Sequence, residues 1–315
     1  MARYILIRLV AMIPTLFLVL LITFTLGYLG PVDPVKVLQQ QQAAQGVFLS
    51  PQQVQELRHQ YGLDRSFGEQ FVSYVTNLTR GNFGFSFYDY VPVWPRIQTA
   101  LPVSLQLAAG ALLLLVFVGV PLGVLAARYH NTRIDYTIVG GSLFLYSIPV
   151  YVLVPMTLIV TVLWLHLMEV PRGWRGVMHP SYFLAAWLLS LRALAGVIRQ
   201  TRAGVLEVLQ NDYVRTARAK GLRERQVVTR HILKNAIIPV VTYLGLLVDD
   251  LVTNAVFVDL AFNLPGIGRL FQTALVSRDF NIIYAVVIFT ALLTMMMNLI
   301  VDLLYPVLDP RVVYD

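Results

Sequence analysis

The sequence predicts an all-α integral membrane protein with six transmembrane helices. Of its 315 residues, 57% are hydrophobic and only 13% are charged, whereas about a quarter of the residues of a soluble domain are charged. Several apolar segments are longer than the ~18 residues that mark a transmembrane helix, and they lack the alternating pattern of barrel strands. Because a bilayer offers no partner to the backbone groups of an open sheet, helices are the expected spanning elements.

The first apolar segment, residues 9–28, follows Arg3 and Arg8. It is longer than the ~7 to 15 residues of a signal-peptide core, and no small-residue cleavage site follows it. We therefore expect residues 1–29 to form a short tail and an uncleaved first transmembrane helix.

Residues 30–98 separate the first two apolar segments and are rich in turn-forming and polar residues. Within them, Ser50 and Pro51 have the residue types of a helix N-cap and first helical position. We expect this stretch to form a small extracytoplasmic subdomain.

Residues 99–315 are expected to form the transmembrane core. The five remaining spans are each near the ~20 residues that cross ~30 Å of hydrocarbon, and they cover residues 101–127, 136–165, 182–198, 237–258 and 282–305.

The distribution of basic residues predicts that both termini are cytoplasmic. The chain carries a net charge of +7. With the N-terminus inside, 15 of its 24 lysines and arginines fall on the cytoplasmic side and nine outside, as the positive-inside rule expects. We therefore assign the excess charge to membrane orientation and expect no nucleic-acid partner.

The cytoplasmic loop, residues 199–235, carries nine basic residues against three acidic ones. Asn211 or Asp212 can cap a first helix, and Gly221 offers the left-handed residue that ends it. The two predicted helices and their turn, residues 211–235, are called the elbow below. The residues expected on its apolar side are Val214, Ala217, Val227, Val228, His231 and Ile232.

Two functions fit such an elbow. Small residues beside the turn, ringed by basic side chains, would let another protein dock closely there. The alternative is a basic amphipathic segment that lies on anionic lipid.

The elbow segment Tyr213-Val-Arg-Thr-Ala-Arg-Ala-Lys-Gly221-Leu resembles the "EAA" loop of ABC importer permeases of the oligopeptide, dipeptide and nickel family. Arg215 and Thr216 stand where the general loop has Glu and Ala, and Lys234 replaces a frequent proline, which favours a continuous second helix. The resemblance extends to Leu101-Pro-Val-Ser-Leu, Pro121-Leu-Gly-Val-Leu-Ala-Ala127, Leu264-Pro-Gly-Ile-Gly-Arg-Leu270, Val301-Asp-Leu-Leu-Tyr305 and Leu308-Asp-Pro-Arg311.

This resemblance implies the type I ABC importer permease fold, in the plasma (inner) membrane of a bacterium or archaeon. It implies a second permease, two cytoplasmic ATPases that bind ATP and Mg²⁺, and an extracytoplasmic substrate-binding protein. Membrane lipid is the remaining partner. The elbow would be the coupling helix that docks on an ATPase, and the residues implied in this contact are Arg215, Thr216, Ala217, Arg218, Lys220, Gly221 and Leu222.

Peptides are the cargo that the resemblance favours, imported by alternating access. Nickel or another small solute is the alternative within the family. Outside it, the alternatives are a non-transporting membrane scaffold or receptor and an intramembrane enzyme without a recognised motif.

The sequence offers no catalytic, cofactor or metal motif of its own. A Walker A loop needs a Gly-Lys pair, but the three lysines follow Val35, Ala219 and Leu233. The chain has no His-Glu-x-x-His, no Gly-x-Ser-x-Gly and no cysteine, so thiolate metal sites and a cysteine nucleophile are excluded. Any ATP hydrolysis would therefore belong to a partner.

Three polar residues near the centre of the fifth span are candidates for a translocation pathway: Asp249, Asp250 and Asn254. A charged side chain is costly at this depth unless it faces a cavity or a partner. Lining a pathway, these residues would favour cationic or amine-bearing solutes. The alternative is a structural carboxylate pair, buried against Arg192 or another helix.

Overall fold

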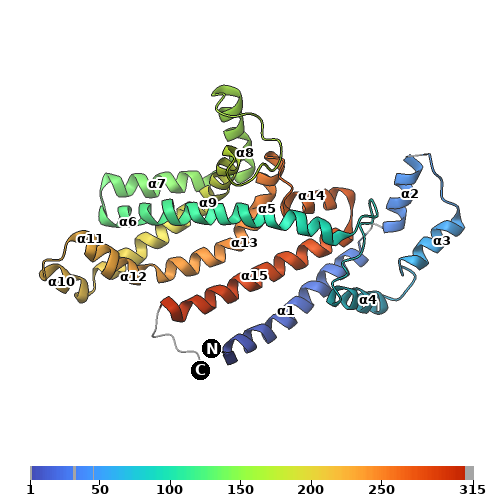
Figure 1. Cartoon of the computed structure of the whole chain (residues 1–315), viewed down its shortest axis with the longest axis horizontal. Helices are drawn as coiled ribbons and strands as arrows, with labels where there is room; N and C mark the ends of the chain where they lie inside the picture. The colour runs from blue at the N-terminus through green and yellow to red at the C-terminus, as the bar shows by residue number, and fades with distance from the viewer. Residues whose placement is uncertain (1, 31–32, 45, 309–315) are drawn as a thin grey trace. The chain divides into compact units, whose positions relative to one another are not determined.

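The computed structural model describes residues 2–30, 33–44 and 46–308. The described residues are almost entirely helical, and their only β-pairing is an isolated bridge between Phe85 and Pro92. Figure 1 shows the order of the helices along the chain. The described residues divide into two compact units: a core unit, residues 103–268 with 294–308, and an N-terminal unit, residues 2–102 with 269–293. The motif Leu308-Asp-Pro-Arg311 extends outside the described residues.

Among the residues that the structure describes, five helices are long and apolar enough to cross a membrane, or six if one bent pair counts as a span. This agrees with the six predicted spans. The five candidates are Tyr4–Tyr28 within α1 (Ala2–Tyr28), Val93–Arg128, α9 (Pro180–Leu209), Glu224–Val248, and Phe280–Leu303 within α15 (Phe280–Leu308).

Two of these candidates are composites. Val93–Arg128 joins α5 (Val93–Leu114), the π-helical turn η1 (Leu115–Gly119) and α6 (Val120–Arg128). Glu224–Val248 runs from the second half of the elbow into α13 (Ile238–Ala261). A helix that crosses the bilayer here is therefore continuous with the elbow.

The third span differs from the single helix expected over residues 136–165. It is formed by α7 (Arg133–Ser147), α8 (Val150–Leu158) and the π-helical η2 (Ile159–Trp164), with a bend of 97° between α7 and α8. Pro149 explains the break, because a proline disfavours helical geometry in the residue before it. Ile148 accordingly has an extended backbone, with φ −83° and ψ 120°.

Helix α9 is the centre of the core unit, and α6, α7 and α13 pack on it. It continues to Leu209, well beyond the span expected to end at residue 198. Gly123 of α6 allows a close approach, because a Cβ there would lie 2.5 Å from Cβ of Thr201 and 2.8 Å from the carbonyl oxygen of Ile198.

The N-terminal unit contains α1, α2 (Pro34–Ala44), α3 (Pro51–Gln60), α4 (Phe67–Thr79) and the start of α15. Ser50 caps α3 as predicted, and Ser66 caps α4 in the same way. Aromatic rings fill its core, where Phe24 lies 5.4 Å from Phe71 and 5.9 Å from Tyr284 between ring centroids. A cavity of about 820 Å³ lies within this unit, lined by Arg58, Tyr61, Tyr74 and Asn281 among others.

Candidate functional site

The elbow has the predicted order of helix, glycine turn and helix. Its first helix is α10 (Asp212–Ala219), and Asn211 occupies the N-cap position without a side-chain hydrogen bond. Gly221 has φ +75°, the left-handed geometry expected of the residue that ends this helix. The second helix is continuous through α11 (Glu224–Gln226), the π-helical η3 (Val227–Ile232) and α12 (Leu233–Ala236). Continuity was predicted from Lys234.

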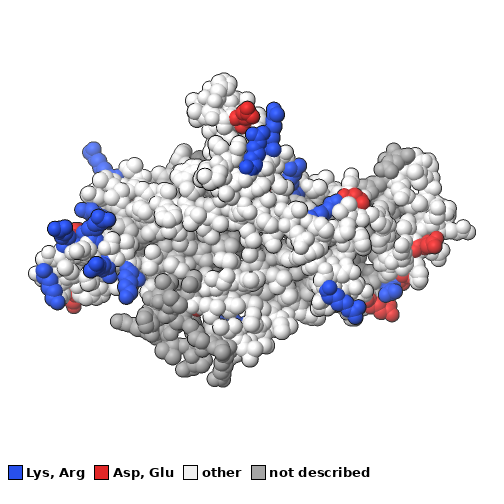
Figure 2. Space-filling model, viewed as in Figure 1, with Lys and Arg blue, Asp and Glu red and all other residues white. Residues whose placement is uncertain are grey.

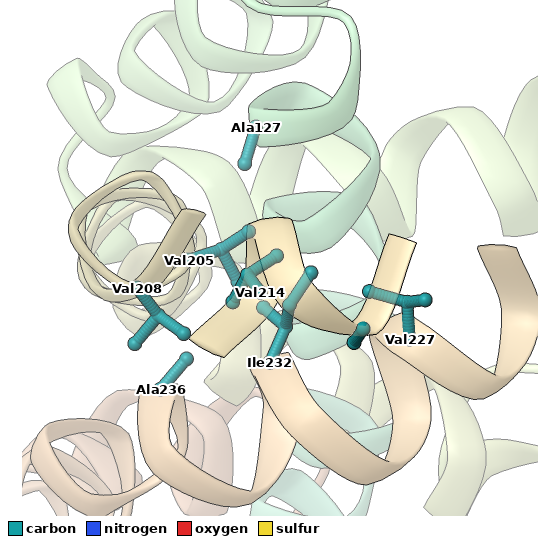
Figure 3. Packing of buried hydrophobic residues seen from close by; sticks show 8 residues of the cluster. Ala127, Val205, Val208, Val214, Val227, Ile232 and Ala236 are labelled. Carbon is teal, nitrogen blue, oxygen red and sulfur yellow. The ribbon is translucent and has the colours of Figure 1, made fainter. Parts of the chain in front are cut away.

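The apolar side of the elbow packs against the rest of the core unit. Val214 and Val227 are fully buried, and Ala217 and Ile232 are nearly so. They form one cluster with Val205, Val208, Ala127 and Ala236, contributed by α9, α6 and α12 (Figure 3). The elbow is therefore seated on the ends of α6 and α9 of the core unit.

Six of the seven residues predicted to contact a partner are exposed: Arg215, Thr216, Arg218, Lys220, Gly221 and Leu222. Ala217 belongs to the buried cluster instead, so its side chain packs α10 against the core unit. Figure 2 shows lysine and arginine side chains gathered where Figure 1 places α10 and α11. A Cβ on Gly221 would meet no atom within 4 Å, so the turn is open to an approaching surface.

An ion pair joins the two helices across the glycine turn. The guanidinium of Arg218 donates to Oε1 of Glu224 at 2.9 Å and to Oε2 at 3.3 Å. Nδ2 of Asn235 also donates to the Tyr213 hydroxyl at 2.9 Å. These contacts join the two helices across the turn while leaving most basic groups of the elbow exposed.

A buried carboxylate near the elbow ties α7 to α9. Asp135 is 1% exposed and accepts hydrogen bonds from Nε and Nη2 of Arg202 at 2.7 and 2.8 Å, and from the backbone N–H of Asn131 at 3.0 Å. Sequence reasoning missed this pair. An acidic residue at the start of an apolar helix was the available signal, because such a group needs a partner when it is buried.

The pathway candidates lie on α13. Nδ2 of Asn254 donates to the carbonyl oxygen of Asp250 at 2.8 Å and to its Oδ1 at 2.9 Å, so these two side chains share a face as their spacing predicted. Asp250 is exposed and Asn254 is half-buried. The side chain of Asp249 lies outside the described part of the structure. The same exposed face carries Leu246, Thr253, Phe257 and Leu260.

Two of the motifs that carry the resemblance meet in the core unit. The backbone N–H of Ile267 donates to Oγ of Ser104 at 2.8 Å. Next to it, the N–H of Gly268 donates to Oδ2 of the fully buried Asp259 at 3.1 Å. A Cβ on Gly266 would lie 2.3 Å from the same oxygen. Position 266 therefore requires glycine, because the carboxylate of Asp259 lies so close to it. Sequence reasoning overlooked this carboxylate.

Within the described ranges, no group of three or more histidine, aspartate or glutamate side chains could hold a metal ion. The chemistry that these residues offer is docking and recognition by charge and hydrogen bonds.

Comparison with known proteins gives consistent matches. Residues 119–314 match the family model described as "Binding-protein-dependent transport system inner membrane component", and residues 1–108 match the model for its N-terminal part. The chain is 37% identical over 316 residues to the oligopeptide transport system permease protein OppB of Salmonella typhimurium, covering 100% of both chains. It is 34% identical to the dipeptide transport system permease protein DppB of Escherichia coli K12, covering 99% of both.

Among solved structures, the chain is similar to a chain of the methionine ABC transporter MetNI in an inward-facing conformation. The TM-score is 0.57 at 16% identity, over 68% of this chain and 98% of that one. At this identity the likeness concerns the fold alone, and it agrees with the expected ABC importer permease fold.

Proposed function

The chain belongs to the family of inner membrane components of binding-protein-dependent transport systems, and from this membership we propose that it imports peptides as a permease subunit of an ABC transporter. The observation that carries the proposal is full-length similarity to permeases named for oligopeptide and dipeptide transport. The apolar helices fit a multi-pass protein of the inner membrane. Peptides would enter the cytoplasm by alternating access.

The proposed assembly contains a second permease, two cytoplasmic ATPases and an extracytoplasmic substrate-binding protein. The ATPases would bind ATP and Mg²⁺, since this sequence has no Walker A loop. Both termini and the elbow would face the cytoplasm, where the basic residues accumulate. Residues 30–98 would then lie on the side from which the binding protein delivers cargo.

In this proposal the elbow is the coupling helix. Arg215, Thr216, Arg218, Lys220, Gly221 and Leu222 would contact a groove of an ATPase, and Ala217 would hold α10 on the buried cluster. When the ATPases close on nucleotide, the elbow would follow, and α6 and α9 would move with it because they share that cluster. Rigid-body motion of packed helices is a usual form of such transitions.

The pathway in this proposal passes the exposed face of α13. Asp250 and Asn254 lie on that face, and Asp249 stays a candidate by its position in the sequence. A carboxylate at bilayer depth is tolerated where it faces water or a partner, and an aqueous pathway between two permeases provides this environment.

The test is Gly221→Asp in the assembled complex. A carboxylate on the open turn would oppose close docking and strain a backbone at φ +75°. We expect loss of ATPase association and of ATP hydrolysis stimulated by the binding protein. Gly176→Asp is the matched control, since Gly176 has φ +90° and equally open surroundings outside the elbow; it should retain both activities. Equal stimulation in the two variants, or a wild-type complex without stimulation, would contradict the coupling role.

A further inference from the structure

The cavity of the N-terminal unit lies where two of the candidate spans end. Its lining includes Phe24 and Tyr28 from the last turns of α1, and Phe280 and Tyr284 from the first turns of α15. These two helix ends are in close contact, because a Cβ on Gly27 would overlap the hydroxyl group of Tyr284. Since the apolar spans end here, the cavity lies at the level of the lipid headgroups, where tyrosine side chains are commonly found.

The cavity is large enough for a ligand and is open at its rim. Its volume of about 820 Å³ falls within the ~300 to 1,000 Å³ of ordinary small-molecule pockets. Tyr28 and Phe85 line it and are 45% and 52% exposed. Helix α4 packs on the same end of α1 (Figure 1). Phe17, seven residues before Phe24, lies on the same side of α1 and is 48% exposed. An exposed apolar face therefore continues from the cavity along the span.

One polar group at the cavity lacks a partner. The hydroxyl oxygen of Tyr61, a lining residue, is buried and has no hydrogen bond among the described residues. Its ring packs against Phe87 and Tyr90, with centroids 5.6 and 5.9 Å away. A buried polar group without a partner is rare and costly. A ligand in the cavity would supply the missing hydrogen bond.

The described lining carries one positive charge more than it neutralises. Its charged side chains are Asp33, Arg58 and Arg65. Asp33 and Arg58 form an ion pair with each other. Arg65 is exposed and takes part in no ion pair among the described residues. The net charge of this lining therefore suits an anionic ligand.

The two carboxylates closest to Arg65 in the sequence are engaged by other groups. Oδ2 of Asp64 lies 2.7 Å from Nδ1 of His59. Oε2 of Glu69 accepts hydrogen bonds from the backbone N–H and the hydroxyl of Ser66 at 2.9 and 2.8 Å. The guanidinium of Arg65 therefore keeps its hydrogen-bond donors for another anion.

We propose that this cavity binds the headgroup of a phosphatidylglycerol lipid from the adjoining leaflet, with Arg65 holding the phosphate and the Tyr61 hydroxyl hydrogen-bonded to the headgroup. Guanidinium groups suit phosphates because they donate two parallel hydrogen bonds. The amide of Asn77 lines the cavity as a partner for the hydroxyls of the head glycerol. An acyl chain would follow the face of α1 that carries Phe17. Lipid binding here is separate from peptide import and would anchor α3 and α4 to the membrane.

The chemistry of the lining selects against phosphatidylethanolamine. Its head carries an ammonium group, which would need an acidic partner when it leaves water. Asp33 is the one carboxylate in the described lining, and Arg58 already neutralises it. The head of phosphatidylglycerol is uncharged beyond its phosphate, so it needs hydrogen bonds alone.

The experiment uses the purified full-length chain in detergent after removal of lipid. Native mass spectrometry measures the dissociation constant of the first bound molecule of dioleoyl phosphatidylglycerol, of dioleoyl phosphatidylethanolamine and of glycerol phosphate, a water-soluble phosphate ester. The variants are Arg65→Gln and Tyr61→Phe. Arg80→Gln is the matched control, an exposed arginine of the same unit outside the cavity lining.

We expect the wild type to bind phosphatidylglycerol about fivefold more tightly than phosphatidylethanolamine, whose ammonium stays unpaired. Arg65→Gln should weaken binding of phosphatidylglycerol about tenfold, since a hydrogen bond to a charged group is stronger than a neutral one, and Tyr61→Phe about threefold. Arg80→Gln should change neither constant. Tyr61→Phe should not lower the thermal unfolding midpoint of the lipid-free chain, because its hydroxyl has no partner there to lose.

Three results would overturn the proposal. Equally tight binding of the two lipids would remove the assigned headgroup, and equal weakening by Arg65→Gln and Arg80→Gln would indicate general surface charge. Glycerol phosphate that binds as tightly as phosphatidylglycerol would indicate a site for a soluble phosphate ester. Tyr61→Phe removes a single oxygen, so it keeps the test decisive even if Arg65→Gln fails to fold.

Discussion

Gly123 shows how strongly a single residue controls the packing of the core unit. Its Cα faces α9 so closely that a methyl group would overlap Cβ of Thr201 and the carbonyl oxygen of Ile198. Gly140 of α7 offers the opposite situation, because a Cβ there would meet nothing within 4 Å. The two positions are therefore a matched pair for the same substitution.

We predict that Gly123→Ala destabilises the folded protein by about 1 to 3 kcal/mol, the usual cost of forcing extra atoms into a packed interior. Gly140→Ala should be neutral or stabilise by about 0.5 to 1 kcal/mol, because alanine favours a helix over glycine. The measurement is the thermal unfolding midpoint of the purified complex in detergent. Equal shifts for both variants would contradict the close approach of α6 and α9.

Among the elements, α3 and α4 begin with the same capping arrangement but differ in one titratable group. Ser50 pairs with Gln53 at the start of α3, and Ser66 pairs with Glu69 at the start of α4. Hydrogen bonds from the backbone N–H and the hydroxyl of Ser66 lower the pKa of Glu69 below its ordinary value. Such a carboxylate contributes stability above its ordinary pKa and loses it as the pH falls through the lowered one.

We therefore predict that acidification weakens the start of α4 and leaves the start of α3 unchanged. Amide hydrogen exchange, corrected for the intrinsic effect of pH, should accelerate at residues 67–70 and not at residues 51–54. Glu69→Gln should abolish the acceleration, since glutamine accepts the same hydrogen bonds at any pH. Acceleration at both helix starts would instead indicate general acid unfolding of the unit.

Local signals predicted the elbow well, because caps and glycine turns depend on neighbouring residues. Gly221 was expected to be left-handed and Val214 to face inward, and both predictions are confirmed. The bend of 97° beside Pro149 was not predicted, because a proline marks a break but packing sets its angle. The contact of Asp259 with Gly268 was missed, since a buried carboxylate shows its partner only after folding.

At the scale of the whole molecule, α9 connects the elbow without a break to the level at which Gly196 meets Tyr243 of α13. Val205 and Val208 hold one end in the buried cluster, and Arg199 lies only six residues from Val205. Six residues span about 9 Å of helix, too short a length to bend freely. Motion imposed on the elbow by an ATPase would therefore reach the segment of α9 around Arg199 directly, provided that the elbow lies on the cytoplasmic side.

That orientation gives the last prediction. The chain contains no cysteine, so a single introduced thiol reports the location of its own residue. Gln52 and Thr229 are exposed, and the positive-inside rule places them on opposite sides of the membrane. In right-side-out vesicles, Gln52→Cys should react with a membrane-impermeant maleimide, and Thr229→Cys should react only after permeabilisation. The reverse pattern would place the elbow outside, where no ATPase could reach it, and would remove the basis of the proposed coupling.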